Sequence, residues 1–250
     1  MVAAASEEGG VVTNGMSRYA RAEENANAAL LVNVDPRDFG SDDVLAGVNL
    51  QRHIEQTAFA MAQKYHALPY QAPCQRVGDF LAERAAQEKL QEKEAESAPS
   101  SSSEVKPLTV SSLSIANKKA PSLESSVCKK VRPSYGRGTF NASIAECLPT
   151  FVSDALAQAL PLMGKKLPHF DDPCAIMTAP ETRSSSPVRI KRGKDLQAYG
   201  KSADCNAREA DAMGTGVYPC GEGPGFAGGI MSAACDGLRV ARSIIDSLCL

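Results

Sequence analysis

A polar segment divides this 250-residue chain and limits where a folded core can form. Between about residues 95 and 130 the composition shifts to Ser, Lys, Pro and Glu, and the run SAPSSSSEVKPLTVSS is its clearest part. Such a stretch buries too little apolar surface to offset the entropy lost on ordering it. We therefore predict a disordered insertion at 95–130 and a shorter polar insertion at 200–214, with the folded parts on either side.

Helical spacing of apolar residues predicts several helices in those folded parts. An amphipathic helix is expected over 49–65, and a second should begin near Val77 and become solvated in its later turns. Ser143 and Glu146 fit an S-x-x-E capping box at the start of a short helix. The apolar face of a further helix is predicted at Phe151, Val152, Ala155, Leu156 and Ala159.

Short apolar runs between turn residues predict a few strands. ALLVNV at 29–34, followed by the turn residues DPRDFGSDD, is typical of a buried strand that leads into a surface loop. CAIMTA at 174–179 and PVRI at 187–190 are predicted as two more, with prolines as breakers. Together with the helices, these strands indicate a mixed helix and strand fold.

Charge and cysteine usage exclude several classes of protein. The formal net charge is −2, and no stretch gathers Lys and Arg with aromatic residues, so we expect no nucleic-acid partner. No apolar run approaches the roughly 20 residues that a membrane span needs, and no targeting signal is visible. The eight cysteines stand singly, without a C-x-x-C pair, which is typical of reduced thiols. We expect a soluble protein of a reducing compartment, cytosol or plastid stroma.

The chemistry-bearing residues predict neither a metal centre nor a serine hydrolase. His53, His66 and His169 are far apart, and the spacing of the first two does not put them on one helix face. No G-x-S-x-G elbow is present. Cys220, close to Glu222, could be a reactive thiol, although a buried cysteine more often serves as a small apolar residue.

A glycine-rich turn, GEGPGFAGG, opens the last helix of the chain. Val217, Tyr218 and Pro219 suit the end of a strand before it, and residues 223–228 match G-x-G-x-x-G. Its unpaired N–H groups, at the positive end of a helix dipole, can bind a phosphate or another electron-rich atom. For an isolated motif of this kind, tight packing of a strand on a helix is the commoner explanation of the glycines. The predicted helix has this apolar stripe: Ile230, Ala233, Ala234, Gly237, Val240, Ala241, Ile244, Ile245 and Leu248.

The turn does not form a complete dinucleotide fingerprint. That fingerprint needs a second parallel strand with an acid about 20 residues after the glycines. Asp246 stands at about that distance but lies inside the predicted helix, and the chain ends at Leu250. Glu222, within the turn, could instead accept hydrogen bonds from sugar or ribityl hydroxyls.

At this point the sequence resembles a family. VYPCGEGPGFAGGIMSAACDG is similar to the C-terminal part of the largely uncharacterised FAD-dependent dehydrogenases of bacteria and plastid-bearing eukaryotes, flavoproteins of the two-dinucleotide-binding-domain type. Residues 5–34, the helix with APCQRVGDFL at 72–81, and 180–190 resemble blocks of that family in the same order. In the family, a large N-terminal flavin-binding region precedes the segment that begins here at Met1.

The resemblance implies a partial FAD site. Glu222 would contact the ribityl chain, and the remaining cofactor contacts would come from the turn: Gly223, Ala227, Gly228 and Gly229. It also makes two polar groups candidate contacts to the flavin edge or to an anionic substrate, although a surface role is an alternative for both. They are Arg183, Ser184 and Ser185 in one loop, and Asn14 and Ser17 near the N-terminus.

We therefore predict an α+β fold for the C-terminal part of a FAD-dependent oxidoreductase. Residues 1–94 and 131–199 would form the substrate-side domain, and residues 215–250 the strand, turn and helix that complete the flavin domain. The activity would be hydride or electron transfer to an unknown small molecule, and this chain alone would be incomplete and inactive. A separate flavin-binding chain is a candidate partner. The alternative is a non-catalytic module, a truncated paralogue that acts through protein–protein association.

Overall fold

The computed structural model describes residues 6–15, 19–97, 131–182, 185–198 and 215–248. The chain forms two compact units, Met1–Val32 with Ile54–Glu181, and Asn33–His53 with Thr182–Leu250. Both predicted insertions lie outside the described residues, except that 95–97 form the end of a helix. The architecture is a mixture of α-helices and a small mixed sheet.

A three-stranded sheet lies at the centre of the first unit. Strand β1 (Ala72–Arg76) pairs in parallel with β2 (Thr139–Asn141) and antiparallel with β3 (Ile176–Thr178). The prediction of a strand within 174–179 is confirmed by β3. The pattern of residues does not predict strands β1 and β2. In β1 three successive residues, Ala72, Pro73 and Cys74, are buried, so the run lacks the alternation of apolar and polar residues that indicates a half-buried strand.

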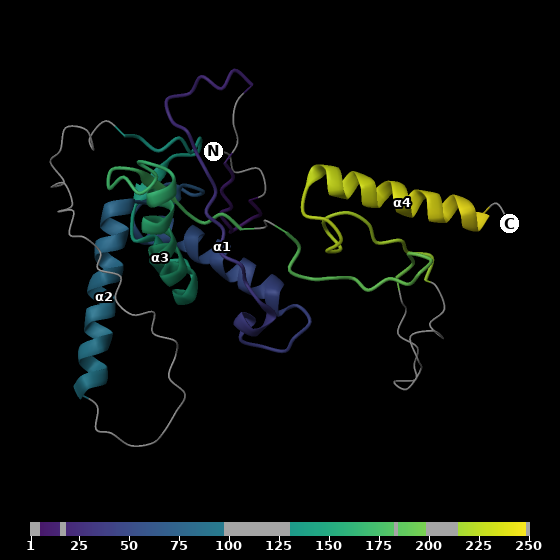
Figure 1. Cartoon of the computed structure of the whole chain (residues 1–250), viewed down its shortest axis with the longest axis horizontal. Coiled ribbons are helices and arrows are strands. Elements are labelled where there is room, and N and C mark those ends of the chain that lie inside the picture. Colours follow the sequence, from purple (N-terminus) through teal and green to yellow (C-terminus); the bar gives the residue numbers. More distant parts are fainter. Residues whose placement is uncertain (1–5, 16–18, 98–130, 183–184, 199–214, 249–250) are drawn as a thin grey trace. The chain divides into compact units, whose positions relative to one another are not determined.

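The predicted helices of the first unit are confirmed. Helix α1 (Ala46–Lys64) covers most of the amphipathic stretch and buries Ala58, Met61 and Ala62, although its residues up to His53 belong to the second unit. Helix α2 (Val77–Ser97) begins at the predicted residue, directly after β1, and becomes exposed in its later turns. Helix α3 (Thr150–Lys166) packs beside α2, as Figure 1 shows.

The core of the first unit joins segments that are far apart in the sequence. Phe80 of α2, Leu160 of α3 and Val11 of the N-terminal segment are at most 1% exposed. The N-terminal segment is held by backbone bonds, since the Val11 N–H donates to the carbonyl of Glu55. Burying side chains of this size stabilises the unit by about 1.5–3 kcal/mol each.

The expected capping box at Ser143 and Glu146 does not form. The segment is a single 3-10 turn, Ile144–Glu146, without a side-chain cap, and the Ser143 hydroxyl donates instead to Oε1 of Glu83 at 2.7 Å. Glu146 accepts from Nζ of Lys64 at 2.5 Å and from the Tyr65 hydroxyl. Tertiary partners on α1 and α2 thus take the two side chains that a local cap would have used.

Three strand predictions are wrong. Residues 29–34 form no strand, and Leu31 is 56% exposed, since the run pairs with no strand of the sheet. The turn prediction after it is confirmed by a 3-10 helix, Pro36–Phe39, which Asp35 caps. Residues 187–190 and 217–219 are also irregular. In the described part of the second unit, backbone pairing of this kind is limited to one bridge between Arg192 and Ala198.

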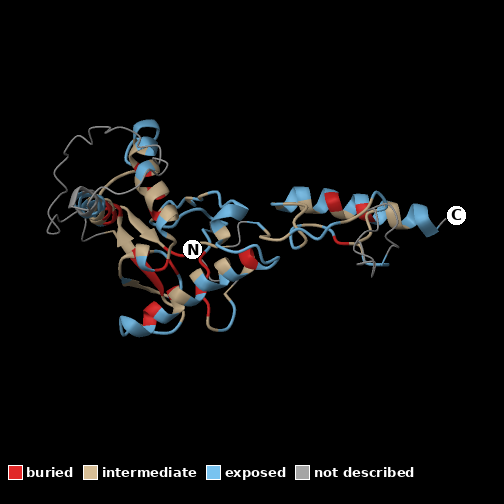
Figure 2. Cartoon of the chain, turned by 90° about the horizontal axis from the view of Figure 1, so that it is seen from below, coloured by how far each residue is buried: buried red, intermediate tan, exposed pale blue. Residues whose placement is uncertain are grey.

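Helix α4 (Ile230–Leu248) is the main regular element of the second unit. It begins directly after the glycine-rich turn, as predicted, and the N–H of Ala233 donates to the carbonyl of Gly229. Its burial departs from the predicted stripe. Asp236 and Val240 are buried, whereas most of the other side chains are exposed, as the pale blue in Figure 2 shows.

Candidate functional site

The glycine-rich turn is held by its own backbone. The N–H of Gly225 donates to the carbonyl of Glu222 at 2.8 Å, and the N–H of Phe226 donates to the carbonyl of Gly221 at 3.1 Å. Gly221 and Gly225 have φ values of +82° and +84°, in the left-handed region that side chains disfavour. Glycine is therefore required at these two positions by the conformation of the turn itself.

Gly225 also makes the closest approach to another segment. A Cβ atom at this position would lie 2.5 Å from the carbonyl oxygen of Val188 and 3.2 Å from the Cα of Arg189. The neighbouring Ile190 N–H donates to the carbonyl of Pro224 at 3.1 Å. Close packing thus explains this glycine, although the packed segment is irregular rather than a strand.

Gly228 is explained by neither conformation nor packing. A Cβ atom there would meet nothing within 4 Å, and its φ lies outside the left-handed region. The residue is exposed, and no hydrogen bond in the described part of the chain uses its N–H or that of Ala227. Gly228 therefore leaves bare backbone donors at the start of α4, where a ligand atom can approach closely.

A buried ion pair fixes the turn to α4. Nη2 of Arg192 lies 2.6 Å from Oδ1 of Asp236, and both side chains are 7% exposed. Nη1 of Arg192 donates to Oδ2 of Asp236 at 3.0 Å and to the carbonyl of Pro219 at 2.8 Å. Oδ2 of Asp236 also accepts from the N–H of Gly221 at 3.0 Å. The bidentate pair therefore ties both the entry and the first glycine of the turn to the helix.

The electrostatics of this pair favour the ionised aspartate. The hydrogen bonds from Arg192 lower the pKa of Asp236 from 3.8 to about 2, with a smaller lowering effect from the Gly221 N–H and an opposing effect of burial. Asp236 is therefore a carboxylate at neutral pH, and its charge is matched by Arg192. Asp236 and Arg192 have a structural role in the site, because both side chains are buried. Their hydrogen bonds go to each other, to the Pro219 carbonyl and to the Gly221 N–H.

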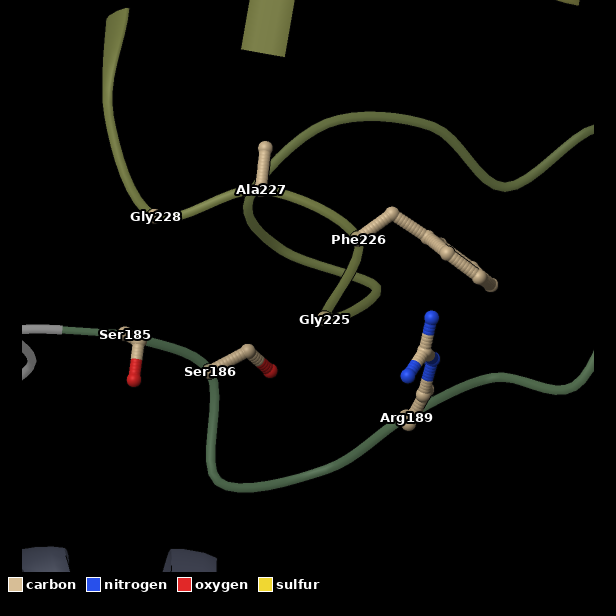
Figure 3. A pocket seen from close by; sticks show the side chains of 7 residues that line it. All are labelled: Ser185, Ser186, Arg189, Gly225, Phe226, Ala227 and Gly228. Carbon is tan, nitrogen blue, oxygen red and sulfur yellow. The ribbon is translucent and has the colours of Figure 1, made fainter. Parts of the chain in front are cut away.

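A cavity of about 340 Å³ opens beside the turn. Figure 3 shows Ser185, Ser186 and Arg189 on one segment, facing the turn residues Gly225 to Gly228. The guanidinium carbon of Arg189 lies 4.7 Å from the centroid of the Phe226 ring, and Arg189 is exposed. The cavity therefore combines a cation, hydroxyl groups and the bare start of α4, a set suited to an anionic or electron-rich ligand atom.

The predicted cofactor residues lie in one turn but have different surroundings. Ala227 and Gly228 line the cavity. Glu222 and Gly223 are exposed and lie in the same turn, outside the cavity lining. The N–H of Gly229 donates to Oγ of Ser232 at 3.1 Å, so this donor already has a partner.

The predicted flavin-edge and substrate residues are only partly described. Ser185 lines the cavity, whereas Arg183, Ser184 and Ser17 lie outside the described residues. Asn14 is an exposed residue of the first unit. Its neighbour Thr13 donates to the carbonyl of Pro180 from both N–H and hydroxyl, at 2.9 and 2.7 Å. The structure therefore places the segment around Asn14 next to Pro180, within the first unit.

Sequence reasoning missed Arg189, Arg192, Phe226 and Asp236. Asp236 carried a usable signal, because an acid that lies between Ala233 and Val240 on an apolar helix face predicts a buried cation as its partner. The two arginines belong to a run, RIKRG, that is typical of a solvated surface. Nothing in that run distinguishes the buried Arg192 from its exposed neighbours.

The described cysteines differ in burial and in whether the thiol is free. Cys74 and Cys147 are buried free thiols, whereas Cys220 and Cys235 are exposed free thiols. Cys174 is disulfide-bonded, so the expectation of a reduced thiol is wrong at this position. Cys128, Cys205 and Cys249 lie outside the described residues.

Within the described ranges, no three His, Cys, Asp or Glu side chains form a group that could hold a metal ion. Among the same residues, no helix has the length and apolar character needed to cross a membrane.

Comparison with known proteins decides the family. Residues 1–120 and 115–184 match the family described as FAD-dependent protein, C-terminal domain-like. The chain belongs to this family. The match ends before the glycine-rich turn and α4, so the resemblance to FAD-dependent proteins is confirmed chiefly on the segments that build the first unit.

A relative extends the similarity of this FAD-dependent protein C-terminal domain to the end of the chain. An uncharacterized protein of Clostridium beijerinckii (strain ATCC 51743 / NCIMB 8052) is 38% identical over 246 residues, which is 98% of this chain. The chain spans only 36% of the length of that relative. The turn and α4, which the family match does not cover, are therefore matched by this longer uncharacterized relative.

The residues of the turn fit part of a flavin nucleotide. Bare backbone at Gly228 and the Arg189 cation suit its electron-rich atoms, and the exposed Glu222 carboxylate suits its hydroxyls. The described part of the second unit does not contain the strand, turn and helix with a following acidic strand that would hold the pyrophosphate and adenosine.

Proposed function

We propose that this chain is the C-terminal part of a FAD-dependent oxidoreductase and supplies one side of its flavin site. The observation that carries this proposal is the unexplained glycine at 228, whose open backbone donors face a cavity with Arg189. An added Cβ would meet no protein atom there, so the absence of a side chain serves something other than the packing of the described chain. The family, which is described as FAD-dependent, supports a flavin as that partner.

In this proposal the protein binds and orients the cofactor, and FAD when bound supplies the hydride or electron transfer. The Glu222 carboxylate accepts hydrogen bonds from the ribityl hydroxyls. The N–H groups of Ala227 and Gly228 donate to the flavin edge at the start of α4. Arg192 and Asp236 keep the turn in the geometry that presents these groups.

The substrate-side role belongs to the first unit in this proposal. Asn14 follows Thr13, which is bonded to the carbonyl of Pro180, and burial raises the pKa of the next residue, Glu181. Asn14 and Ser17 of this unit are proposed to contact an unknown small molecule or the flavin edge. Arg183, Ser184 and Ser185 of the second unit are proposed for the same kind of contact on their own account.

Reconstitution with FAD tests the proposal. The chain alone is expected to bind FAD weakly, and the chain mixed with the part of the Clostridium relative that it does not match is expected to retain FAD through dialysis. Glu222→Gln should weaken FAD binding about 10-fold, the loss expected for hydrogen bonds to a charged acceptor. Asp246→Asn is the matched control, because it removes the same charge from an exposed residue late in α4.

Two results would contradict the proposal. Near-stoichiometric FAD in the purified chain alone would show that the site is not partial. Equal FAD retention by the Glu222→Gln and Asp246→Asn variants would remove Glu222 from the site. Association without any uptake of FAD would instead favour a non-catalytic module.

A further inference from the structure

Arg189 brings a positive charge to the cavity beside the glycine-rich turn. Within the described part of the chain its guanidinium forms no ion pair or hydrogen bond, whereas that of Arg192 is matched by Asp236. The contact of Arg189 is with the Phe226 ring, whose centroid lies 4.7 Å from the guanidinium carbon. A ring face attracts the cation but accepts no strong hydrogen bond, so the guanidinium N–H groups stay open to an acceptor. An anion that enters the cavity can therefore bind them.

The backbone positions Arg189 from both sides. The N–H of Ile190 donates to the carbonyl of Pro224 at 3.1 Å. The carbonyl oxygen of Val188 lies so close to Gly225 that a Cβ atom there would approach it to 2.5 Å. These contacts hold the residues before and after Arg189 against the turn. Binding an anion therefore does not require this segment to become ordered, which lowers the entropic cost of binding.

The cavity has two walls of different chemistry, as Figure 3 shows. We call Ser185, Ser186 and Arg189 the arginine wall, and residues 225–228 the turn wall. The hydroxyl of Ser186 already donates to the carbonyl of Val188 at 2.9 Å. Ser185 is exposed, and its hydroxyl has no acceptor among the described residues. The arginine wall thus offers a cation and a hydroxyl to a ligand, and the turn wall offers backbone donors.

We propose that the arginine wall binds the carboxylate of the substrate, so that the oxidoreductase acts on a small carboxylic acid. This assignment rests on the proposed function, in which the turn wall faces the edge of the flavin. A guanidinium binds a carboxylate through two parallel N–H···O bonds, a geometry that a point charge does not offer. The Ser185 hydroxyl adds a further donor on the same wall. A substrate held by Arg189 would thus have the flavin edge on the facing wall of the same cavity.

Charge and size favour a monocarboxylate over other anions. Arg189 is one cation, and the exposed carboxylate of Glu222 lies in the turn next to the cavity. A phosphate with about two negative charges would exceed what Arg189 can balance and would be repelled by Glu222. A carboxylate is balanced by Arg189 alone. The cavity of about 340 Å³ lies at the lower end of the roughly 300–1,000 Å³ that is typical of small-molecule sites. The substrate class is therefore a small monocarboxylic acid.

A matched pair of probes tests the assignment on the full chain. 4-Fluorobenzoate and 4-fluorobenzamide have nearly the same size and shape and differ in charge. Their binding is measured by fluorine NMR, and the amide shifts of residues 225–228 report where they bind. Arg189→Met removes the proposed cation. Arg242→Met is the control, because Arg242 is an exposed arginine of α4 outside the cavity lining. Both variants should keep the wild-type melting temperature.

The wild-type chain should bind 4-fluorobenzoate about 10-fold or more tightly than 4-fluorobenzamide, since only the acid forms charge-assisted hydrogen bonds with Arg189. Arg189→Met should lose this preference and leave the amide probe unaffected. Arg242→Met should stay within about 2-fold of wild type for both probes, as expected for an exposed charge away from the ligand. The amide shifts that the acid causes should be centred on the turn wall.

Several outcomes would overturn the inference. Equal binding of the two probes, or no binding of 4-fluorobenzoate, would remove the carboxylate site. An equal loss in Arg189→Met and Arg242→Met would reduce the effect to the overall charge of the chain. Tighter binding of inorganic phosphate than of 4-fluorobenzoate would assign the arginine wall to a phosphate group.

The FAD-loaded complex separates this inference from the proposed function. The complex is the chain mixed with the unmatched part of the Clostridium relative, and 4-fluorobenzoate should bind to it together with FAD. Release of the probe on uptake of FAD would assign Arg189 to the cofactor, which overturns the inference and leaves the proposed function standing. Arg189-dependent binding of the probe without any uptake of FAD would do the reverse.

Discussion

The guanidinium carbon of Arg192 lies 3.6 Å from the centroid of the Phe226 ring. The same guanidinium is paired with Asp236, so one side chain connects the aromatic residue of the glycine-rich turn to the middle of α4. A cation over an aromatic face contributes about 0.5–2 kcal/mol, and more where water is excluded. Arg192 therefore determines the conformation of the turn as well as the charge balance of the unit.

Replacing Arg192 with methionine should destabilise the second unit by about 3–5 kcal/mol, because Asp236 would remain buried without its partner. Hydrogen exchange of the α4 amides measures the effect on this unit separately from the first. The double variant Arg192→Met with Asp236→Leu should recover much of the loss, since no unpaired charge is left. Arg189→Met is the control and should cost at most about 0.5 kcal/mol. Equal effects of Arg192→Met and Arg189→Met would contradict the role of the ion pair.

Asp236 should make the second unit sensitive to acid. Its pKa is lowered from 3.8 to about 2 in the folded chain, so the ionised form stabilises the unit above pH 3.8, and this contribution is lost as the pH falls toward 2. A shift of this size corresponds to about 2 kcal/mol. Denaturation followed between pH 6 and pH 2, by hydrogen exchange of α4, checks it. In Asp236→Asn this acid-dependent loss should be absent, and its persistence would assign the loss to other carboxylates.

Gly225 and Gly228 should respond in opposite ways to alanine. Gly225→Ala forces a side chain into a left-handed conformation and against the Val188 carbonyl, so it should cost more than about 2 kcal/mol. Gly228→Ala should change the free energy of unfolding by no more than about 0.5 kcal/mol, because its Cβ meets no protein atom. Chemical denaturation measures both values. A large loss of stability in Gly228→Ala would show that packing, and not a ligand, requires this glycine.

The four free cysteines in the described part of the chain should divide into two reactivity classes. Burial raises the pKa of Cys147 to about 12 and also raises that of Cys74, so both should be slow to react as thiolates at neutral pH. Cys220 and Cys235 are exposed and should be alkylated first. Iodoacetamide labelling followed by peptide mass spectrometry checks the order. Labelling of Cys147 before Cys220 in the folded chain would contradict the burial that the structure gives them.

Local patterns predicted the helices of this protein well. The spacing of Ala58, Met61 and Ala62 located α1, and the apolar residues and strong helix formers that follow Val77 located the start of α2 near that residue. Helices carry their own hydrogen bonds, so a run of 10 to 20 residues contains most of what determines them. The position of the glycine-rich turn before α4 was predictable for the same reason.

Long-range partners explain what the sequence could not predict. Ala72, Pro73 and Cys74 form a strand because β2 and β3 lie on both sides of them, whereas ALLVNV is richer in strand-forming residues and pairs with no strand of the sheet. Ser143 looked like a helix cap but donates to Glu83 on α2. In the candidate site, the pairing of Arg192 with Asp236 spans 44 positions in the chain, and no local pattern encodes it.

The parallel pairing of β1 with β2 has a consequence for the length of this protein. Ala72 is in register with Thr139, so the sheet closes across a connection that includes α2 and the whole polar stretch after it. The entropic cost of closing a loop grows only logarithmically, by about 0.6 kcal/mol for each doubling of length. The fold therefore has a site at which residues can be gained or lost at little thermodynamic cost, and homologues can differ greatly in size between Ser97 and Thr139 while they keep the same sheet.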